Sequence, residues 1–387
     1  MRAECVQALI RNPIAYDARQ ACIPRFCHLR HRTRSRRALR NRGYKVEVYD
    51  QLEPPPKSLI VGKVRSGIDG LISTLRDRID AEIFEAGRGT LKVVAQDAVG
   101  YDNINRADAN RYRVPFTNTA DVLTEATAEF AFFILGNVAR RLYPAERLVR
   151  ENRWGTWHPY LPFLGDEVTG KTIGVIGTGR IGQAFIKKAL SFDADILCFD
   201  PLAPAHDYIK KVQEVMDTRF RAGFSPDQRT IRYVTFERAL RDSDFVSLHV
   251  PLLSPDESDF ATYHLLNERT LRLMRPTAFL INTSRGAVVD EQALYAAIKE
   301  GVIAGAALDV FETEPLPVDS PLRDPSIENR VRLFAHFASA ARVTRLSTDP
   351  NKGMAGRCVQ GLIDVLEGNY GGNPADMPYV VNKEAFR

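Results

Sequence analysis

The sequence predicts an α/β protein built from two domains, and three observations support this. The chain has 387 residues, and a domain usually holds ~100–200. From residue 44 onward, short apolar runs alternate with helical patterns, which is typical of parallel βαβ units. A glycine-rich motif begins at Gly177, near the middle of the chain, so a separate domain must precede it.

The composition excludes several classes of protein. The chain is 44% hydrophobic and 26% charged, which excludes wholesale disorder. Its longest apolar stretches, such as 130–135, are far shorter than the ~20 residues needed to span a bilayer, so we expect no membrane segment. Five scattered cysteines form no disulfide framework and favour a reducing, cytoplasmic location.

Residues 1–44 differ in composition from the rest of the chain. They contain eleven Arg, no Lys and two acidic residues, a net charge of +9, so the remaining residues sum to −4. We predict an Arg-rich N-terminal extension with three open interpretations: a solvated arm, a targeting peptide for an organelle, or a patch for an anionic surface. The mildly acidic body has no electrostatic reason to bind nucleic acid. No metal is expected, because no zinc spacing is matched by Cys22, Cys27, His28 and His31.

The first domain is predicted from the strand-like runs that follow residue 44. Segments between them, such as 80–86, have the pattern of helices. A longer helical pattern, 123–142, is strongly apolar and is expected to be buried. The polar and aromatic stretch 151–170 is predicted to be a loop. The expected strands of this domain are 46–50, 69–74, 91–97 and 114–119.

A second series of strands is predicted beyond residue 170. These runs are almost continuously apolar, as in strands that helices cover on both faces of a parallel sheet. The segment 354–367 is predicted to be a final helix. The expected strands are 171–177, 194–200, 245–250, 278–284, 305–311 and 331–337.

The sequence GTGRIG at 177–182 is a GxGxxG motif between a predicted strand and a predicted helix. In this context Gly177 permits a tight turn, Gly179 lets the backbone approach a pyrophosphate, and Gly182 lets helix and strand pack closely. The motif therefore predicts a Rossmann-type dinucleotide site. Asp200 ends the next strand, where a carboxylate binds the ribose hydroxyls and repels a 2′-phosphate, which favours NAD(H) over NADP(H). The remaining motif positions assigned to the cofactor are Thr178, Arg180 and Ile181.

A second constellation suits hydride transfer to a 2-keto acid. Arg285 directly follows a predicted strand, and its planar fork suits bidentate binding of a carboxylate. His336, in the last strand pattern, is a candidate acid/base, and Glu314 is placed to pair with the imidazole and stabilise its cationic form. His249 is an equally good candidate from the residues alone, so the choice between the two histidines stays open at this point.

Five segments, in this order, resemble the D-isomer-specific 2-hydroxyacid dehydrogenase family. Further segments, including AVGYDNI at 98–104 and WGTWHP at 154–159, make the chain look most like the glyoxylate/hydroxypyruvate reductases of that family. The likeness covers roughly residues 45–387. The five segments are GKTIGVIGTGRIGQAF (170–185), SLHVPL (247–252), LMRPTAFLINTSRGAVVDEQAL (273–294), AGAALDVFETEP (304–315) and HFAS (336–339).

The resemblance implies a role for each site residue. Arg285 would bind the substrate carboxylate, His336 would be the acid/base, and Glu314 its partner. The backbone at Val99 and Gly100 would meet the substrate carboxylate from the other domain. Trp157 would reach the neighbouring active site across a homodimer interface. Besides the glycine motif, Asp200, Arg285 and His336, the implied cofactor contacts are Thr127, His249, Val250, Pro251, Thr283, Ser284 and Asp309.

The resemblance also implies an architecture and a reaction. A Rossmann-type NAD domain would span 122–343, and a smaller flavodoxin-like substrate domain would combine 45–121 with 344–387, with the active site in the cleft between them. We expect NAD(H)-dependent reduction of a small 2-keto acid, of the glyoxylate or hydroxypyruvate class, to the D-2-hydroxy acid. Two alternatives stay open: an NAD(H)-sensing, partner-binding protein of corepressor type, and a dehydrogenase of another small anion or a larger 2-keto acid.

The chain departs from the family pattern at four places. Residues 1–44 show no clear version of the family's first strand and helix. The residue before His336 is Ala335, where the family usually has Pro. An extra stretch, 346–353, lies between this histidine and the last helix. Asp97 stands where relatives usually have an apolar or aromatic residue close to the substrate.

Overall fold

The computed structural model describes two compact units. The first combines Met1–Leu123 with Ala340–Arg387, and the second is Thr124–Ser339. The prediction for most of the N-terminal extension lies outside the described residues. In the part of the chain that is described, no helix is long and apolar enough to cross a membrane. The described residues are 8–11, 37–49, 51, 53–160, 163–202, 204–256 and 258–387.

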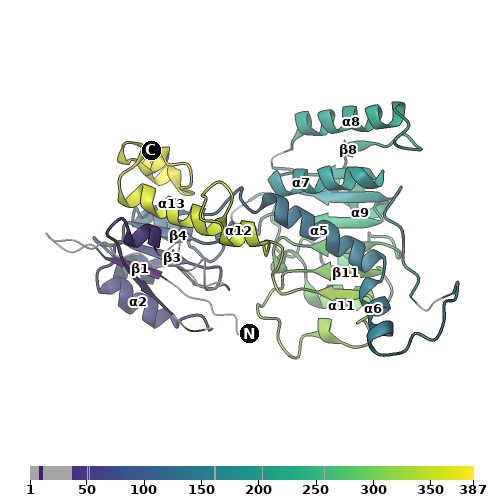
Figure 1. Cartoon of the computed structure of the whole chain (residues 1–387), viewed down its shortest axis with the longest axis horizontal. Coiled ribbons are helices and arrows are strands. Elements are labelled where there is room, and N and C mark those ends of the chain that lie inside the picture. The colour runs from purple at the N-terminus through teal and green to yellow at the C-terminus, as the bar shows by residue number, and fades with distance from the viewer. Residues whose placement is uncertain are drawn as a thin grey trace. The chain divides into compact units, whose positions relative to one another are not determined.

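The first unit contains a five-stranded sheet in the order β2-β1-β3-β4-β5. This is the order of a flavodoxin-like sheet. Figure 1 labels three neighbouring strands of it, β1, β3 and β4. Strands β3, β4 and β5 are parallel, whereas β1 runs antiparallel to both of its neighbours, β2 and β3. The sheet is therefore mixed, and its first strand comes from the segment that we had assigned to the extension. The strands are β1 (Ala8–Arg11), β2 (Lys45–Val48), β3 (Gly70–Ser73), β4 (Val93–Gln96) and β5 (Phe116–Thr117).

Helices cover both faces of this sheet. On one face, apolar residues of α2, α3 and α4 pack on buried residues of β3, β4 and β5. On the other face, α13 packs on β3 and β4 together with Leu39 and Tyr44. Leu39 and Tyr44, which were predicted to belong to the N-terminal extension, thus contribute to this core. The helices are α2 (Lys57–Arg65), α3 (Ala81–Ala86), α4 (Arg106–Arg111), α12 (Arg342–Leu346) and α13 (Met354–Leu366), with short 3-10 turns η4 (Tyr370–Gly372), η5 (Pro374–Asp376) and η6 (Lys383–Phe386).

The second unit contains a seven-stranded sheet in the order β12-β11-β10-β9-β6-β7-β8. Every neighbouring pair is parallel. Numbered from β6, the order 3-2-1-4-5-6 of the Rossmann fold is present with one further strand at the edge. The chain reverses its direction of progress between β6 and β9, and ligands bind at such a switch point. The strands are β6 (Thr172–Ile176), β7 (Asp195–Phe199), β8 (Ile231–Tyr233), β9 (Phe245–Leu248), β10 (Phe279–Asn282), β11 (Gly305–Leu308) and β12 (Val331–Leu333).

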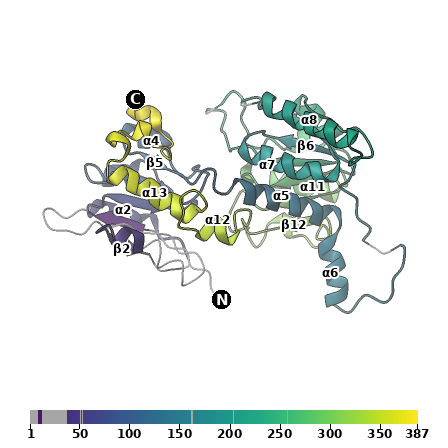
Figure 2. The same ribbon diagram turned by 45° about the horizontal axis from the view of Figure 1, so that its top comes forward.

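Two apolar clusters lie on opposite faces of this sheet. One cluster joins β6 and β7 to α5, α7 and α8, and the other joins β9, β10 and β11 to α9, α10 and α11. Figures 1 and 2 both show α5 alongside α7. The helices are α5 (Thr124–Ala139), α6 (Leu142–Arg150), α7 (Arg180–Ala189), α8 (His206–Arg221), α9 (Phe236–Asp242), α10 (Glu268–Leu271) and α11 (Glu291–Lys299), with 3-10 turns η1 (Leu190–Phe192), η2 (Gly286–Val288) and η3 (Pro321–Arg323).

Two elements differ from the sequence-based expectation. The helix predicted at 123–142 ends at Ala139, and α6 follows after Arg141, which adopts a left-handed conformation with φ of 53°. Burial of this helix is also incomplete, because Phe133 is 63% exposed. The last strand ends at Leu333, so His336 lies in the loop that follows it rather than in the strand.

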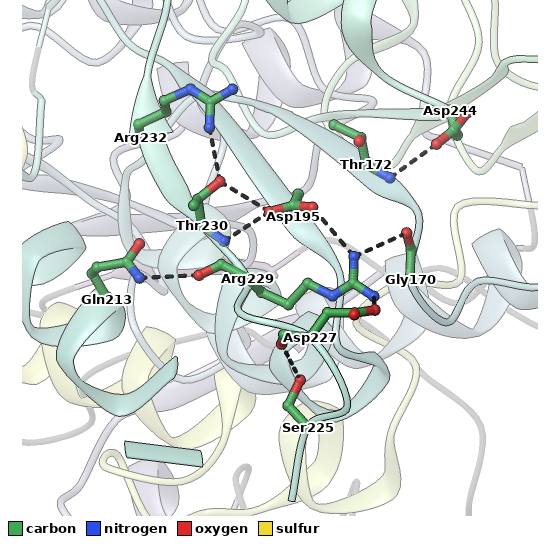
Figure 3. A network of polar contacts seen from close by, with 10 residues as sticks. All are labelled: Gly170, Thr172, Asp195, Gln213, Ser225, Asp227, Arg229, Thr230, Arg232 and Asp244. Atoms are coloured by element: carbon green, nitrogen blue, oxygen red, sulfur yellow. Dashed lines mark hydrogen bonds and ion pairs between the residues drawn. The ribbon is translucent and has the colours of Figure 1, made fainter. Parts of the chain in front are cut away.

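A polar network fixes the amino ends of β6, β7 and β8 (Figure 3). Asp195 accepts hydrogen bonds from the backbone N–H and hydroxyl of Thr230, at 2.7 and 2.9 Å. The Arg229 guanidinium lies 3.5 Å from Asp195 and 2.9 Å from Asp227. Gln213 on α8 donates to the Arg229 carbonyl at 3.0 Å. These contacts join α8 and the segment before β8 to the edge of the sheet.

Candidate active site

The glycine motif forms the turn between β6 and α7. Gly177 has a φ of 93°, and a Cβ there would lie 2.5 Å from the His249 carbonyl oxygen. A Cβ at Gly182 would collide with the Gly177 carbonyl, so this glycine lets α7 approach the strand. A Cβ at Gly179 would meet no atom within 4 Å among the described residues. Gly177 and Gly182 are therefore required by packing, whereas Gly179 faces open space.

The geometry of this turn fits a dinucleotide. Gly179 is the N-cap of α7, and within the described chain no side chain caps this helix end. The first N–H groups of a helix lack intrahelical acceptors and, with the helix dipole, favour an anion such as a pyrophosphate. Thr178 is fully buried below the turn, whereas Arg180 and Ile181 begin the helix.

Asp200 lies directly after β7, beside the glycine turn. Its Oδ2 accepts a hydrogen bond from the Thr178 backbone N–H at 2.8 Å and from the Thr178 hydroxyl at 3.3 Å. Its Oδ1 accepts from the Leu202 backbone N–H at 3.1 Å. The carboxylate is thus fixed at the carboxyl edge of the sheet, where a ribose would lie next to the pyrophosphate.

Arg285 lies in the turn that follows β10, and Asn282 shapes this turn. The Asn282 amide donates to the Arg285 carbonyl at 2.8 Å and accepts from the N–H and hydroxyl of Ser284, at 3.0 and 2.7 Å. A Cβ at Gly286 would collide with the backbone of Phe311 and Glu312, so the Arg285 turn packs directly on the loop after β11. The Thr283 hydroxyl is buried and has no hydrogen-bond partner among the described residues.

Glu314 and His336 form an ion pair on the loops after β11 and β12. His336 Nδ1 lies 2.9 Å from Glu314 Oε2, and both side chains are about one-third exposed. Burial raises the pKa of Glu314, but the hydrogen bond and charge of His336, the Phe311 N–H and the Arg285 charge outweigh it, so this pKa is lowered. Arg285 is therefore close enough to Glu314 to act on its ionisation.

Asp309 anchors the turn that carries His336. His336 has a left-handed φ of 55°, which is unfavourable for a residue with a Cβ. The Asp309 carboxylate accepts the N–H groups of Phe337 and Ala338 at 2.6 and 2.7 Å, and its carbonyl accepts that of His336 at 2.8 Å. Burial raises the pKa of Asp309, and these hydrogen bonds and the His336 charge oppose that rise.

His249 lies directly after β9, in an environment unlike that of His336. Its ring packs on that of Phe185, with 4.8 Å between the two ring centroids, and its Nε2 lies 2.9 Å from the Ser247 hydroxyl. Nδ1 is buried without a hydrogen-bond partner in the described part of the chain, and burial lowers the His249 pKa to about 3. A histidine that stays neutral across the physiological range is a poor proton donor.

The remaining predicted cofactor residues also lie in the second unit. Val250 and Pro251 continue the segment after β9, and a Cβ at Gly177 would lie 3.0 Å from Val250. The Pro251 carbonyl accepts from the Thr262 hydroxyl at 2.6 Å. Thr127 is buried in the first turn of α5.

Val99 and Gly100 lie in the first unit, after β4. Asn118 donates to the Val99 carbonyl at 2.8 Å, and Gln96 donates to the Gly100 carbonyl at 3.2 Å. Asp97 begins the same turn; its Oδ1 is buried and has no hydrogen-bond partner among the residues described. Burial raises the Asp97 pKa to about 6, against the opposing charge of Arg345.

Two residues that contribute to the site were not identified from the sequence. Asn282 ends an otherwise apolar strand, and a buried amide at a strand end is a signal that could have identified it. Tyr233 ends β8, and its hydroxyl lies 2.7 Å from the Thr178 hydroxyl. Its segment has no motif, so only the folded structure connects it to the glycine turn.

Comparison with known proteins identifies the family. Residues 132–338 match the family described as "D-isomer specific 2-hydroxyacid dehydrogenase, NAD binding domain". The chain is 45% identical over 303 residues to a protein of Korarchaeum cryptofilum named glyoxylate reductase, covering 78% of this chain and 82% of that protein. It is 40% identical over 347 residues to a glyoxylate reductase of Thermococcus litoralis, covering 89% and 92%.

A solved structure agrees with this assignment. The TT0316 protein of Thermus thermophilus superposes with a TM-score of 0.72 at 35% identity, covering 90% of this chain and 96% of that one. The dinucleotide turn, the fixed Asp200 and the loops with Arg285, Glu314 and His336 occupy the carboxyl edge of a Rossmann sheet. The chain therefore belongs to the D-isomer specific 2-hydroxyacid dehydrogenase family and is an NAD-dependent oxidoreductase.

Proposed function

We propose that this protein reduces glyoxylate or hydroxypyruvate to the D-2-hydroxy acid, with His336 as the acid/base. The observation that carries the proposal is the contact of 2.9 Å between His336 Nδ1 and Glu314 Oε2, on loops beside the Arg285 turn. The printed names of the relatives from K. cryptofilum and T. litoralis, both glyoxylate reductases, support the substrate class.

The residues divide the chemistry between them. Arg285 binds the substrate carboxylate through its planar guanidinium. When bound, NADH supplies the hydride for C2 of the keto acid. The Glu314 carboxylate pairs with Nδ1 and stabilises the imidazolium, so Nε2 is the nitrogen that gives its proton to the developing alkoxide.

The His336 turn is built for this orientation. Its left-handed backbone is held by Asp309, which binds three successive N–H groups. Such strain persists only where surrounding contacts over-determine it, and it is concentrated at functional sites. Asp309, Thr283 and Ser284 would hold the nicotinamide, while Asp200 and the segment His249–Pro251 would hold the ribose and adenine.

The direct test is a screen of NADH oxidation over glyoxylate, hydroxypyruvate, pyruvate, phenylpyruvate and 2-ketogluconate. We expect kcat/KM to be highest for glyoxylate or hydroxypyruvate, and the product of pyruvate to be D-lactate on a chiral column. A clear preference for phenylpyruvate or 2-ketogluconate would contradict the proposed substrate class. L-lactate would contradict the proposed stereochemistry.

We also propose that the protein is a homodimer. Trp154, Trp157 and Tyr160 in the loop after α6 are 56%, 74% and 79% exposed in the single chain. Aromatic residues exposed in one contiguous segment mark interaction surfaces. A symmetric partner would bury this segment, and Trp157 would then approach the active site of the partner subunit.

We propose a reducing, cytoplasmic location for the protein. The two cysteines in the described part of the chain, Cys198 and Cys358, are buried thiols, which fits such a location.

A further inference from the structure

The Asp200 carboxylate is connected to a residue on the edge strand of the sheet. Tyr233, the last residue of β8, places its hydroxyl 2.7 Å from the Thr178 hydroxyl. The Thr178 hydroxyl in turn donates to Asp200 Oδ2 at 3.3 Å. The Ala205 backbone N–H, just before α8, donates to the Tyr233 hydroxyl at 2.5 Å. Three consecutive hydrogen bonds therefore connect the Ala205 backbone to the Asp200 carboxylate through the hydroxyls of Tyr233 and Thr178. We call this series of hydrogen bonds the relay.

The two ends of this relay fix its direction. The Ala205 backbone N–H can only donate, and the Asp200 carboxylate can only accept. The Tyr233 hydroxyl must then donate to Thr178, whose hydroxyl donates to Asp200. When every hydroxyl in a series both accepts and donates, the hydrogen bonds of that series polarise one another, and each of them becomes stronger. Burial raises the pKa of Tyr233, although its hydrogen bonds with Thr178 and Ala205 oppose this, so the phenol keeps the proton that the relay needs.

The position of Tyr233 is itself fixed from both sides. The His206 ring packs edge-on against the Tyr233 ring at 4.8 Å. At the other end of the short strand β8, Thr230 is bound to Asp195, and Arg229 is held by Asp195 and Asp227 (Figure 3). Tyr233 therefore belongs to a strand whose amino end is held in position by hydrogen bonds and ion pairs.

We propose that Tyr233 is a positioning residue that sets the preference for NADH over NADPH by holding the Asp200 carboxylate and the Ala205 backbone in place. The inference rests on the proposed contact of Asp200 with the cofactor ribose. A fixed carboxylate accepts from both ribose hydroxyls and opposes a 2′-phosphate, whereas a carboxylate that can turn away opposes it less.

The test compares the dissociation constants of NADH and NADPH, measured by titration calorimetry on the full chain. Tyr233→Phe removes one hydroxyl and two links of the relay. The loss of one or two ordinary hydrogen bonds should change the Kd ratio NADPH/NADH about threefold to tenfold in favour of NADPH. Thr178→Val should shift the Kd ratio in the same direction and by a similar factor. Thr178→Ser keeps the hydroxyl and should therefore have the wild-type ratio.

Tyr208→Phe is the matched control. The Tyr208 hydroxyl, also partly buried and close to the cofactor helix, donates to the Gln183 carbonyl of α7 at 2.7 Å and has no place in the relay. The Tyr208→Phe variant should therefore have the same Kd ratio NADPH/NADH as the wild type. Asp200→Ser is the reference, because it should shift the ratio further than any other variant.

Each outcome has one meaning. A shifted ratio in Tyr233→Phe with an unchanged ratio in Tyr208→Phe supports the inference. Equal shifts of the Kd ratio in Tyr233→Phe and Tyr208→Phe would overturn the proposed role of the relay. The same conclusion would follow if Asp200→Ser shifted the ratio and Tyr233→Phe did not. Both results would leave the proposed role of Asp200 intact. An unchanged ratio in Asp200→Ser would overturn the proposed role of Asp200. If Tyr233→Phe fails to fold, the Thr178 pair decides in the same way.

Discussion

At the scale of single residues, local sequence indicates chemistry but not burial. Arg285, Glu314 and His336 were candidates from their residue types and their places after strands, and the structure brings Glu314 and His336 to 2.9 Å. The residues alone left His249 as an equal candidate, because both histidines occur in apolar runs. What separates them is tertiary: the His249 ring packs on Phe185 with its Nδ1 buried, whereas His336 lies on a loop after the last strand of the sheet.

Replacing Glu314 tests the ion pair through pH. Because the Glu314 pKa is lowered, this carboxylate stays ionised throughout the working range. Glu314→Gln removes the counter-ion of the imidazolium, so the alkaline limb of kcat for reduction should move down by about one pH unit. The control is Glu312→Gln, whose carboxylate instead accepts the Glu291 N–H at 3.0 Å. Equal shifts in both variants would contradict a specific pair.

Asp97 predicts an unusual dependence of stability on pH. Its folded pKa of about 6 lies above the ordinary value of 3.8, so the folded state binds the proton more tightly than the unfolded state. Stability from this group is therefore fully present below pH 4 and is lost as the pH rises through about 6. Asp97→Asn should raise the free energy of unfolding by about 3 kcal/mol at pH 8, with little change at pH 4. Urea titrations at both pH values measure this, and an equal effect at both would refute it.

At the scale of elements, the hydrophobic pattern located the strands but not every boundary. The strands β6, β7, β9, β10 and β11 lie within the predicted runs, because a parallel strand covered on both faces is apolar throughout. The break between α5 and α6 was not predicted, since a left-handed Arg141 has no sequence signal of the kind glycine gives. β12 ends early because the backbone of residues 336–338 binds Asp309 instead of a neighbouring strand.

The glycine turn predicts that binding and stability can be separated. Gly179 has no neighbour within 4 Å of an added Cβ in the described chain, so Gly179→Ala should leave the free energy of unfolding within about 0.5 kcal/mol. The methyl group would occupy the place of the pyrophosphate, and Kd for NADH should rise at least ~10-fold. Gly136→Ala on α5, which is equally open, is the control with unchanged affinity. Unchanged NADH affinity in Gly179→Ala would place the pyrophosphate elsewhere.

At the scale of the whole molecule, the GxGxxG motif and the alternation of elements were sufficient to predict a parallel Rossmann sheet. The two compact units divide after Leu123 and Ser339. The domain boundaries expected after residues 121 and 343 stay a prediction. The antiparallel β1 was not foreseen, because its short apolar run lies within residues 1–44, which were assigned as a whole to the Arg-rich extension. Strand direction depends on pairing with distant strands, which local pattern does not encode.

The exposed aromatic segment predicts the oligomeric state. Trp157→Ser should weaken the proposed dimer about 30-fold or more, as expected when a central tryptophan is lost from an interface. Light scattering coupled to gel filtration over a dilution series measures this. Phe224→Ser, which changes a 75% exposed side chain beyond α8, should leave the dimer intact. A wild-type protein that elutes as a monomer at micromolar concentration would contradict the proposal.

The central claim is that His336 is the acid/base of keto-acid reduction, and His336→Ala tests it most directly. Steady-state reduction of glyoxylate and hydroxypyruvate by NADH should show a kcat lower by ~10²–10⁴-fold, the usual contribution of a positioned general acid. Kd for NADH should remain close to that of the wild type, which shows that the variant is folded. His249→Asn, measured alongside, should retain a far higher kcat. Wild-type turnover in His336→Ala would contradict the account.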